Sequence, residues 1–260
     1  MKRVVHAQLA YYQFDDLAAA PMVYHGIFTR VGGVSRAPFE SLNLSRSVGD
    51  DPLAVTENNR RMLAAFAVKP AQATTAWLVH GQSVAVVDRA DAGHFRQGVD
   101  ALITRTRGLA LTMRFADCVP VVLYDAAHGA IGLAHAGWRG VAVNVVAAAI
   151  DALRAAFGSE PPELWAGIGP CIGVEQYRVG PEVLAAVAAA CPPEAAIAPR
   201  QPDGRVHLDL SAAVTAQLRA CGVTHIEDAR LCTATRTGEW FSHRAEHGQT
   251  GRFGLVIGLH

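Results

Sequence analysis

Residues 115–140 read FADCVPVVLYDAAHGAIGLAHAGWRG and contain two apolar runs, 119–124 and 131–134, separated by a polar turn. Short apolar runs bounded by turn residues indicate buried strands. Cys118 lies just before the first run and His135 lies just after the second. If the two strands pair as an antiparallel hairpin, the start of the first lies beside the end of the second. The sequence therefore predicts that Cys118 and His135 meet in space.

The composition is that of a globular protein. Of the 260 residues, 51% are hydrophobic and 18% are charged, which allows one large domain or two small ones. The formal net charge is zero, so bulk charge favours neither a nucleic acid nor an anionic membrane as partner. We therefore expect a small-molecule partner; the sequence leaves the oligomeric state open.

The cysteines and the N-terminus both favour the cytoplasm. Five cysteines are widely spaced and include no C-x-x-C pair, which is typical of free thiols in a reducing compartment. The polar stretch 11–16 interrupts any secretion signal, and no apolar run reaches the about 18 residues of a membrane span. We expect a cytoplasmic protein.

Apolar patterning outside this stretch predicts further strands and helices. Strands are expected at 22–28, 101–103, 109–113, 164–169 and 253–257, and on both sides of a turn at Gly81 within 77–87, with His80 at the break. Residues 88–98 and the proline-rich span 192–202 read as loops. Helices are expected from Asp51-Pro52 to Phe66, with Leu53, Met62, Leu63 and Phe66 on one face, and over 141–157, 181–190 and 210–220, the last between an Asp209 cap and a Gly222 stop. Runs of strands interspersed with helices predict an α+β fold with mixed sheets, and we read residues 1–260 as one domain.

Three residues remain as carriers of chemistry once common motifs are set aside. The glycine-rich stretch 167–173 does not fit a dinucleotide fingerprint, because Pro170 stands where a helix should begin. His80, Cys118 and His135 can form a three-ligand zinc site with a fourth position open. The same residues are also compatible with a Cys118–His135 thiol dyad, or with unrelated core and turn residues. Spacing alone does not choose among these readings.

The chain resembles the YfiH/LACC (laccase-domain, PgeF-like) family over essentially its whole length. The block HAGWRG at 135–140 is the most specific part of the resemblance. The other matching stretches, in order, are 33–35, 41–44, 49–52, 79–81, 116–118, 169–173, 241–244 and 250–252.

The resemblance implies a single domain of mixed sheets with flanking helices and a zinc ion held by His80, Cys118 and His135. It also implies phosphorolysis of adenosine, inosine, guanosine and S-methyl-5′-thioadenosine, together with adenosine deamination. Two alternatives come with it: a copper-dependent polyphenol oxidase, since the same ligands can hold copper, and an amidase using Cys118 and His135, acting on peptidoglycan precursors.

A phosphorylase must bind a phosphate dianion and move a proton. Arg139, Arg244 and Arg252 are the phosphate candidates, because a guanidinium donates two parallel hydrogen bonds and stays charged. Each of the three is also compatible with an ordinary surface arginine. Asp117, next to a ligand, either shuttles a proton or orients a histidine ligand. Asn43 either bonds the sugar or base or is an ordinary turn residue.

Two departures from the family stand in the C-terminal part. The family's tail commonly reads Phe-Ser-Tyr-Arg-Arg, whereas this chain has Phe241-Ser242-His243-Arg244-Ala245, so only Arg244 of the two arginines is present. Thr235 stands where a second cysteine often follows Cys232, so a metal site in the tail is not expected. Trp138 is a candidate for stacking on a purine or for packing.

Overall fold

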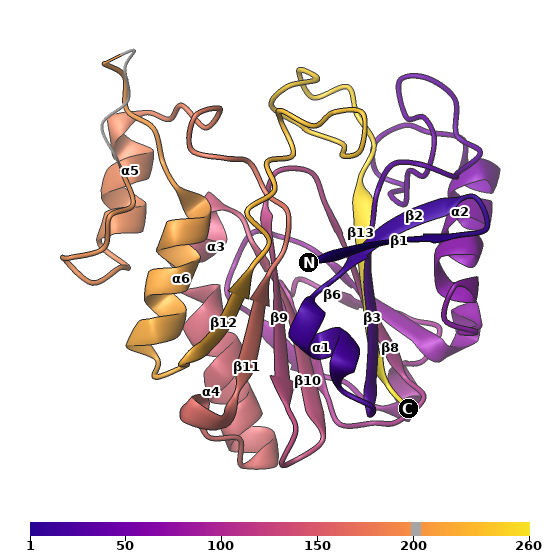
Figure 1. The fold of residues 1–260 in the computed structure, drawn as a ribbon, viewed down its shortest axis with the longest axis horizontal. Helices are drawn as coiled ribbons and strands as arrows, with labels where there is room; N and C mark the ends of the chain where they lie inside the picture. Colours follow the sequence, from indigo (N-terminus) through magenta and orange to yellow (C-terminus); the bar gives the residue numbers. More distant parts are fainter. Residues whose placement is uncertain (199–203) are drawn as a thin grey trace.

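Two β-sheets pack face to face between layers of helices in the computed structural model, which describes residues 1–198 and 204–260 (Figure 1). In spatial order the seven-stranded sheet contains β1 Lys2–His6, β2 Leu9–Gln13, β3 Val23–Phe28, β13 Phe253–Leu259, β8 Ala110–Phe115, β4 Ala73–Trp77 and β6 Phe95–Gln97. The six-stranded sheet contains β12 His225–Asp228, β11 Trp165–Ile168, β9 Val119–Asp125, β10 Ala130–Ala136, β7 Ala101–Thr104 and β5 Val84–Val86.

The predicted hairpin is confirmed and lies in the six-stranded sheet. β9 and β10 pair antiparallel, with Ala136 opposite Val119 and His135 opposite Pro120. Both strands are buried along their whole length, as their unbroken apolar runs predict. Because His135 is one register step from the start of β9, its side chain comes next to Cys118.

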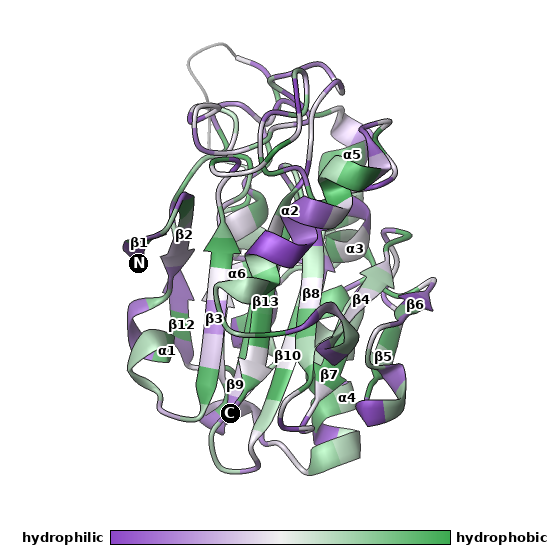
Figure 2. Cartoon of the chain, turned by 90° about the vertical axis from the view of Figure 1, so that its right-hand side faces the viewer, coloured by the Kyte–Doolittle hydropathy of each residue, from purple (hydrophilic) through white to green (hydrophobic). Residues whose placement is uncertain are grey.

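Three hydrophobic layers hold the molecule together. The middle layer lies between the sheets and includes Leu111 and Phe115 from one sheet and Val122 and Leu133 from the other. Helices α3 Trp138–Ala142, α4 Val145–Phe157, α5 Pro181–Ala188 and α6 Leu210–Ala220 cover the outer face of the six-stranded sheet, and α2 Pro52–Ala64 covers that of the seven-stranded sheet (Figure 1). In Figure 2 hydrophobic colour follows the central strands, whereas α2 shows a hydrophilic outer surface. Mixed parallel and antiparallel pairing confirms the α+β class.

The helices lie where the sequence predicts them, but one predicted helix is divided in two and two residues predicted on the buried face of α2 do not lie there. Asp51 caps α2 by accepting from the Leu53 amide, as predicted, but the Leu53 side chain is 79% exposed and Phe66 lies beyond the helix end. The predicted helix over 141–157 is two helices, because Asn144 between α3 and α4 adopts a left-handed φ of 59° and caps α4. Asp209 caps α6, and Gly222 follows its end at φ 95°, as predicted.

The strands show where the prediction from local pattern is wrong. The two apolar runs around Gly81 do not form one unit, since β4 ends at Trp77 in one sheet and β5 belongs to the other. The predicted loop 88–98 contains the short edge strand β6. β1, β2, β12 and the short helix α1 Asp15–Ala19 were not predicted. Residues 199–203 of the predicted loop 192–202 lie outside the described residues. Across residues 1–198 and 204–260 no helix combines the length and apolar character needed to cross a membrane.

Candidate metal and catalytic centre

His80, Cys118 and His135 come together where the chain passes between the two sheets. His80 lies in the connection from β4 to β5, Cys118 lies between β8 and β9, and His135 is near the end of β10. One potential ligand atom from each residue lies within 4.8 Å of the others. His135 is buried, Cys118 half-buried and His80 exposed, so the group opens to solvent on one side. Two imidazoles and a thiolate are a donor set that zinc and copper both accept.

Gly137 leaves the space that this group of side chains occupies. A Cβ atom placed on Gly137 would lie 2.9 Å from both Cys118 Sγ and His80 Nδ1. Side chains do not approach a Cβ atom that closely, so an alanine here would displace a donor atom. The packing explains why a glycine stands at this position of the HAGWRG block: Cys118 Sγ and His80 Nδ1 both lie against its backbone.

Asp100 fixes both histidines and was missed by the sequence analysis. Its Oδ1 accepts hydrogen bonds from Nδ1 of His135 at 3.1 Å and from the His80 amide at 3.0 Å. Its Oδ2 accepts from the Gly81 and Val79 amides. Because Nδ1 of His135 is engaged, the other ring nitrogen is left to face Cys118. A carboxylate bound to the far nitrogen of a ligating histidine is typical of metal sites. The only signal in the sequence is an aspartate directly before a buried strand.

The group carries opposite charges at neutral pH. Burial alone would raise the pKa of Cys118, but the charge of His135 and hydrogen bonds from His135 and His80 lower it to about 6. Burial disfavours the charged form of His135 too, and so lowers its pKa, but the charge of Cys118 and the hydrogen bond to Asp100 raise this pKa to about 9. Cys118 is therefore a thiolate, which is the form that binds metals and attacks electrophiles.

Asp117 does not orient a histidine in the described chain. Its Oδ1 accepts from Thr233 Oγ1 at 2.6 Å and its Oδ2 from the Arg244 amide at 2.7 Å. The prediction that Asp117 orients a ligand is wrong, because Asp100 makes that bond. Asp117 instead ties the C-terminal segment to the metal-ligand loop, and its proton-shuttle role stays a prediction.

Arg139 and Arg244 lie against aromatic rings near the three ligands. The Arg139 guanidinium lies 4.4 Å from the Trp138 ring centre, and that of Arg244 lies 5.0 Å from the Tyr177 ring centre. Arg244 also donates to the Arg178 carbonyl at 2.8 Å. Trp138 lines the same cavity while half-buried, so it is open to both predicted roles.

Asn43 supports Arg252 and has no free bonding group. The Asn43 side chain is 0% exposed, and its amide nitrogen donates to Ser45 and Asp50. Its Oδ1 accepts from the Ser45 and Arg252 amides. This burial disagrees with the prediction that Asn43 contacts a sugar or base directly. It agrees with the alternative prediction that Asn43 is a turn residue. Arg252 reaches the cavity with its guanidinium bonded to the Thr250 and Gly251 carbonyls.

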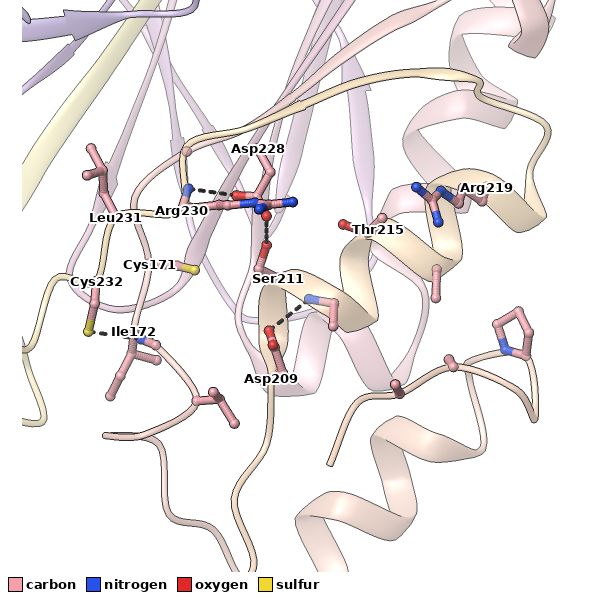
Figure 3. Close-up of a pocket in the computed structure, with 18 of the residues that line it drawn as sticks. Cys171, Ile172, Asp209, Ser211, Thr215, Arg219, Asp228, Arg230, Leu231 and Cys232 are labelled. Atoms are coloured by element: carbon pink, nitrogen blue, oxygen red, sulfur yellow. Dashed lines mark hydrogen bonds between the residues drawn. The ribbon is translucent and has the colours of Figure 1, made fainter. Parts of the chain in front are cut away.

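The three candidate ligands line one cavity of about 940 Å³ together with Asp117, Trp138, Arg139, Arg244 and Arg252, whereas Asp100 and Asn43 lie behind its wall. That volume is in the range of small-ligand sites. A second cavity of about 800 Å³ lies beside α6 (Figure 3) and holds none of the predicted site residues. The two aspartates in its wall bind groups of the protein itself. Asp209 caps α6, and Asp228 accepts hydrogen bonds from the Ser211 hydroxyl and the Arg230 amide. The chemistry therefore belongs to the first cavity.

Comparison with known proteins agrees with this geometry. The family described as multi-copper polyphenol oxidoreductase laccase matches residues 24–260. The chain is 37% identical to purine nucleoside phosphorylase YlmD of Geobacillus stearothermophilus, over 90% of this chain and 89% of that protein. It is 41% identical to purine nucleoside phosphorylase ORF3 of Streptomyces griseus, over 90% and 94% of the two chains.

Solved structures show the same fold. The crystal structure of the Geobacillus YlmD matches with a TM-score of 0.93 at 32% identity, covering 99% of this chain and 98% of that one. The structure of YfiH from Bacillus licheniformis matches with a TM-score of 0.91 at 29% identity, covering 98% and 97%. These matches confirm the predicted α+β fold and the resemblance stated from the sequence.

Proposed function

Because the chain belongs to the multi-copper polyphenol oxidoreductase laccase family, which includes YfiH and YlmD, we propose that it is a purine nucleoside phosphorylase. The observation that supports this most is the convergence of His80, Cys118 and His135 in a cavity lined by Arg139, Arg244 and Arg252. The substrates proposed are adenosine, inosine, guanosine and S-methyl-5′-thioadenosine with phosphate, and adenosine deamination is proposed in addition. We expect the protein to act in the cytoplasm.

The proposed reaction exchanges one bond at C1′ of the ribose. A phosphate oxygen bonds to C1′, the C1′–N9 bond breaks, and the leaving purine takes up one proton. Arginines of the cavity hold the phosphate dianion, and the negative charge of the phosphate stabilises the sugar as it becomes cationic. Asp117, 8% exposed in the same cavity, is the proposed proton carrier.

Zinc is the metal we propose for the three ligands. The donor set fits it, Cys118 is a thiolate, and Asp100 leaves one nitrogen of His135 available. When bound, zinc would polarise a phosphate oxygen or lower the pKa of a water for deamination. Copper is the alternative metal, because imidazole and thiolate bind it as well. Residues 1–198 and 204–260 contain one such group of ligands.

A second candidate function is favoured by the thiolate and imidazolium charges of Cys118 and His135. Such a pair is the arrangement of a cysteine amidase. In that case the His80 side chain is not needed, since nucleophile and acid are already present. Phosphorolysis with a metal requires all three residues.

The deciding experiment incubates the protein with each nucleoside and phosphate and follows the free base, the sugar 1-phosphate and inosine. We expect base and sugar 1-phosphate in equal amounts, the sugar product being 5-methylthioribose 1-phosphate for S-methyl-5′-thioadenosine and ribose 1-phosphate for the other nucleosides. We also expect inosine from adenosine, and loss of both activities in His80→Ala. The metal content of purified protein identifies zinc or copper. Absence of product from every nucleoside contradicts the proposal; turnover of an amide or a phenol then identifies which alternative holds, and a cysteine amidase would retain its activity in His80→Ala.

A further inference from the structure

The cavity contains a cluster of arginines that is separate from the three candidate metal ligands and from the arginines stacked on aromatic rings. The arginine cluster consists of Arg46, Arg114 and Arg252, all of which line the cavity. Arg46 lies in the loop before α2, Arg114 on β8, and Arg252 directly before β13. Of these, only Arg252 is suggested by the sequence analysis.

Strand pairing brings Arg114 and Arg252 together. β8 and β13 pair antiparallel with Arg114 opposite Gly254. Arg252 is two residues before Gly254, so it projects from the same face of the sheet as Arg114. Diagonal neighbours of this kind are within reach of long side chains. The face is the outer one, which packs under α2, rather than the face buried between the sheets.

In the described chain no salt bridge joins Arg46, Arg114 or Arg252 to a carboxylate, although Asp117, Glu246 and the Cys118 thiolate act on Arg252 from a distance. Arg114 donates to the Ala76 carbonyl at 2.9 Å, Arg46 to the Thr56 hydroxyl at 3.0 Å, and Arg252 to two carbonyls. All of these acceptors are neutral oxygens. By contrast, Arg60, which lines the same cavity, is paired with Glu57.

Burying a charged guanidinium without a salt-bridge partner is energetically unfavourable. Burial lowers the pKa of Arg114, and the positive charge of Arg46 lowers it further. Holding two like charges in a partly dry cavity is unfavourable unless an anion joins them. The N–H groups that are not engaged in these bonds are available as donors to such an anion, and a planar guanidinium binds two phosphate oxygens at once.

The cluster lines the same cavity as His80, Cys118 and His135, and its Arg252 lies near Cys118. Burial lowers the pKa of Arg252, whereas the charges of Cys118 and Asp117 raise it, so Arg252 lies within electrostatic reach of both. An anion on the cluster would thus lie beside the reacting centre. Arg139 and Arg244, which are placed against Trp138 and Tyr177, are left for the nucleoside.

We propose that Arg46, Arg114 and Arg252 form the binding site of the inorganic phosphate co-substrate, an inference that rests on the proposed phosphorylase function. The chemistry recognised is a phosphate dianion. A phosphate ester of a nucleotide offers the same group, so the test must separate the two sources.

The test measures binding and kinetics separately. Calorimetric titration with inorganic phosphate, and separately with adenosine 5′-monophosphate, is done on the purified wild-type protein and on Arg114→Gln and Arg46→Gln. We expect phosphate affinity to fall at least about tenfold in Arg114→Gln, since a charged hydrogen bond is lost. The KM for phosphate should rise in parallel, while the KM for the nucleoside stays unchanged. Arg60→Gln is the matched control, from the same cavity wall with its own carboxylate partner, and should bind phosphate as wild type does.

If Arg114→Gln does not fold, Arg46→Gln still tests the proposal, because Arg46 is exposed and its replacement is not expected to disturb folding. Phosphate affinity that survives in both variants but falls in Arg139→Gln overturns the assignment. Tight binding of the nucleotide with no binding of free phosphate also overturns it. If phosphate binds and depends on Arg114 but no nucleoside is cleaved, the anion site stands and the proposed phosphorylase function fails.

Discussion

At the scale of single residues, Asp100 determines the geometry of the centre although it is not one of the three candidate ligands. It fixes the ring of His135 and the backbone at His80 with one carboxylate. We predict that Asp100→Asn lowers metal affinity about 10- to 100-fold, because the amide is a poorer acceptor and leaves the ring free to turn. Metal content after competition with a chelator of known affinity measures this loss.

A matched control exists elsewhere in the fold. Asp125 is equally buried and also accepts from a histidine ring, that of His128, and from that residue's amide. Asp125→Asn should lower stability as Asp100→Asn does, yet retain the metal. Equal metal loss in both variants would mean that Asp100 acts through general stability alone.

His25 makes folding depend on pH. It is 1% exposed, Nε2 accepts from the Phe14 amide at 2.8 Å, and burial lowers its pKa to about 4. The unfolded chain, with a histidine pKa near 6.5, therefore binds a proton that the folded protein rejects between about pH 6.5 and 4. The contribution to stability is complete above pH 6.5 and is lost on acidification, by about 2 kcal/mol at pH 5.

Urea denaturation at pH 8 and pH 5 checks this dependence. We expect the difference in unfolding free energy between the two pH values to shrink in His25→Gln and to stay at its wild-type size in His6→Gln, whose side chain is exposed. An unchanged difference in His25→Gln would show that His25 is not the group responsible.

At the scale of elements, the junction between β10 and α3 decides whether the ligands can meet. Gly137 is the N-cap residue directly before α3, and a Cβ there would lie 2.9 Å from donor atoms of Cys118 and His80. We predict that Gly137→Ala loses most of the metal and of the nucleoside activity while the far-UV circular dichroism stays native. Gly238→Ala, where a Cβ meets nothing within 4 Å, should retain both. Normal metal content in Gly137→Ala would show that the donors have room to shift.

Local pattern predicted those elements whose sequence carries its own signal. The β9–β10 hairpin follows from two apolar runs and a turn, and α2 and α6 follow from their aspartate caps. The exposed edge strands β1 and β6 were missed because their residues alternate little between apolar and polar. Asp100 and Arg114 were missed for a different reason: their partners are distant in sequence, and only strand pairing brings Asp100 to His135 and Arg114 beside Arg252.

At the scale of the whole molecule, the site exists because the chain changes sheets repeatedly at one end. The connection 116–118 leads from β8 in one sheet to β9 in the other, and the connection through His80 leads from β4 to β5. His80 and Asp117 both adopt a positive φ, at 59° and 87°. His80 and Cys118 thus lie on segments that join the two sheets, whereas His135 lies near the end of β10, so the geometry of the group depends on how the sheets pack.

This dependence predicts that residues 1–260 unfold as one unit. The layer between the sheets is a single cluster to which both contribute, and it includes Trp165 from the six-stranded sheet and Trp240 from the C-terminal segment. Separating the sheets would expose that apolar layer to water, so neither is expected to persist alone. Tryptophan fluorescence and far-UV circular dichroism should therefore report the same midpoint in urea. Two separated transitions would show two domains, and loss of the metal before the first transition would show that the connecting segments loosen while the sheets remain packed.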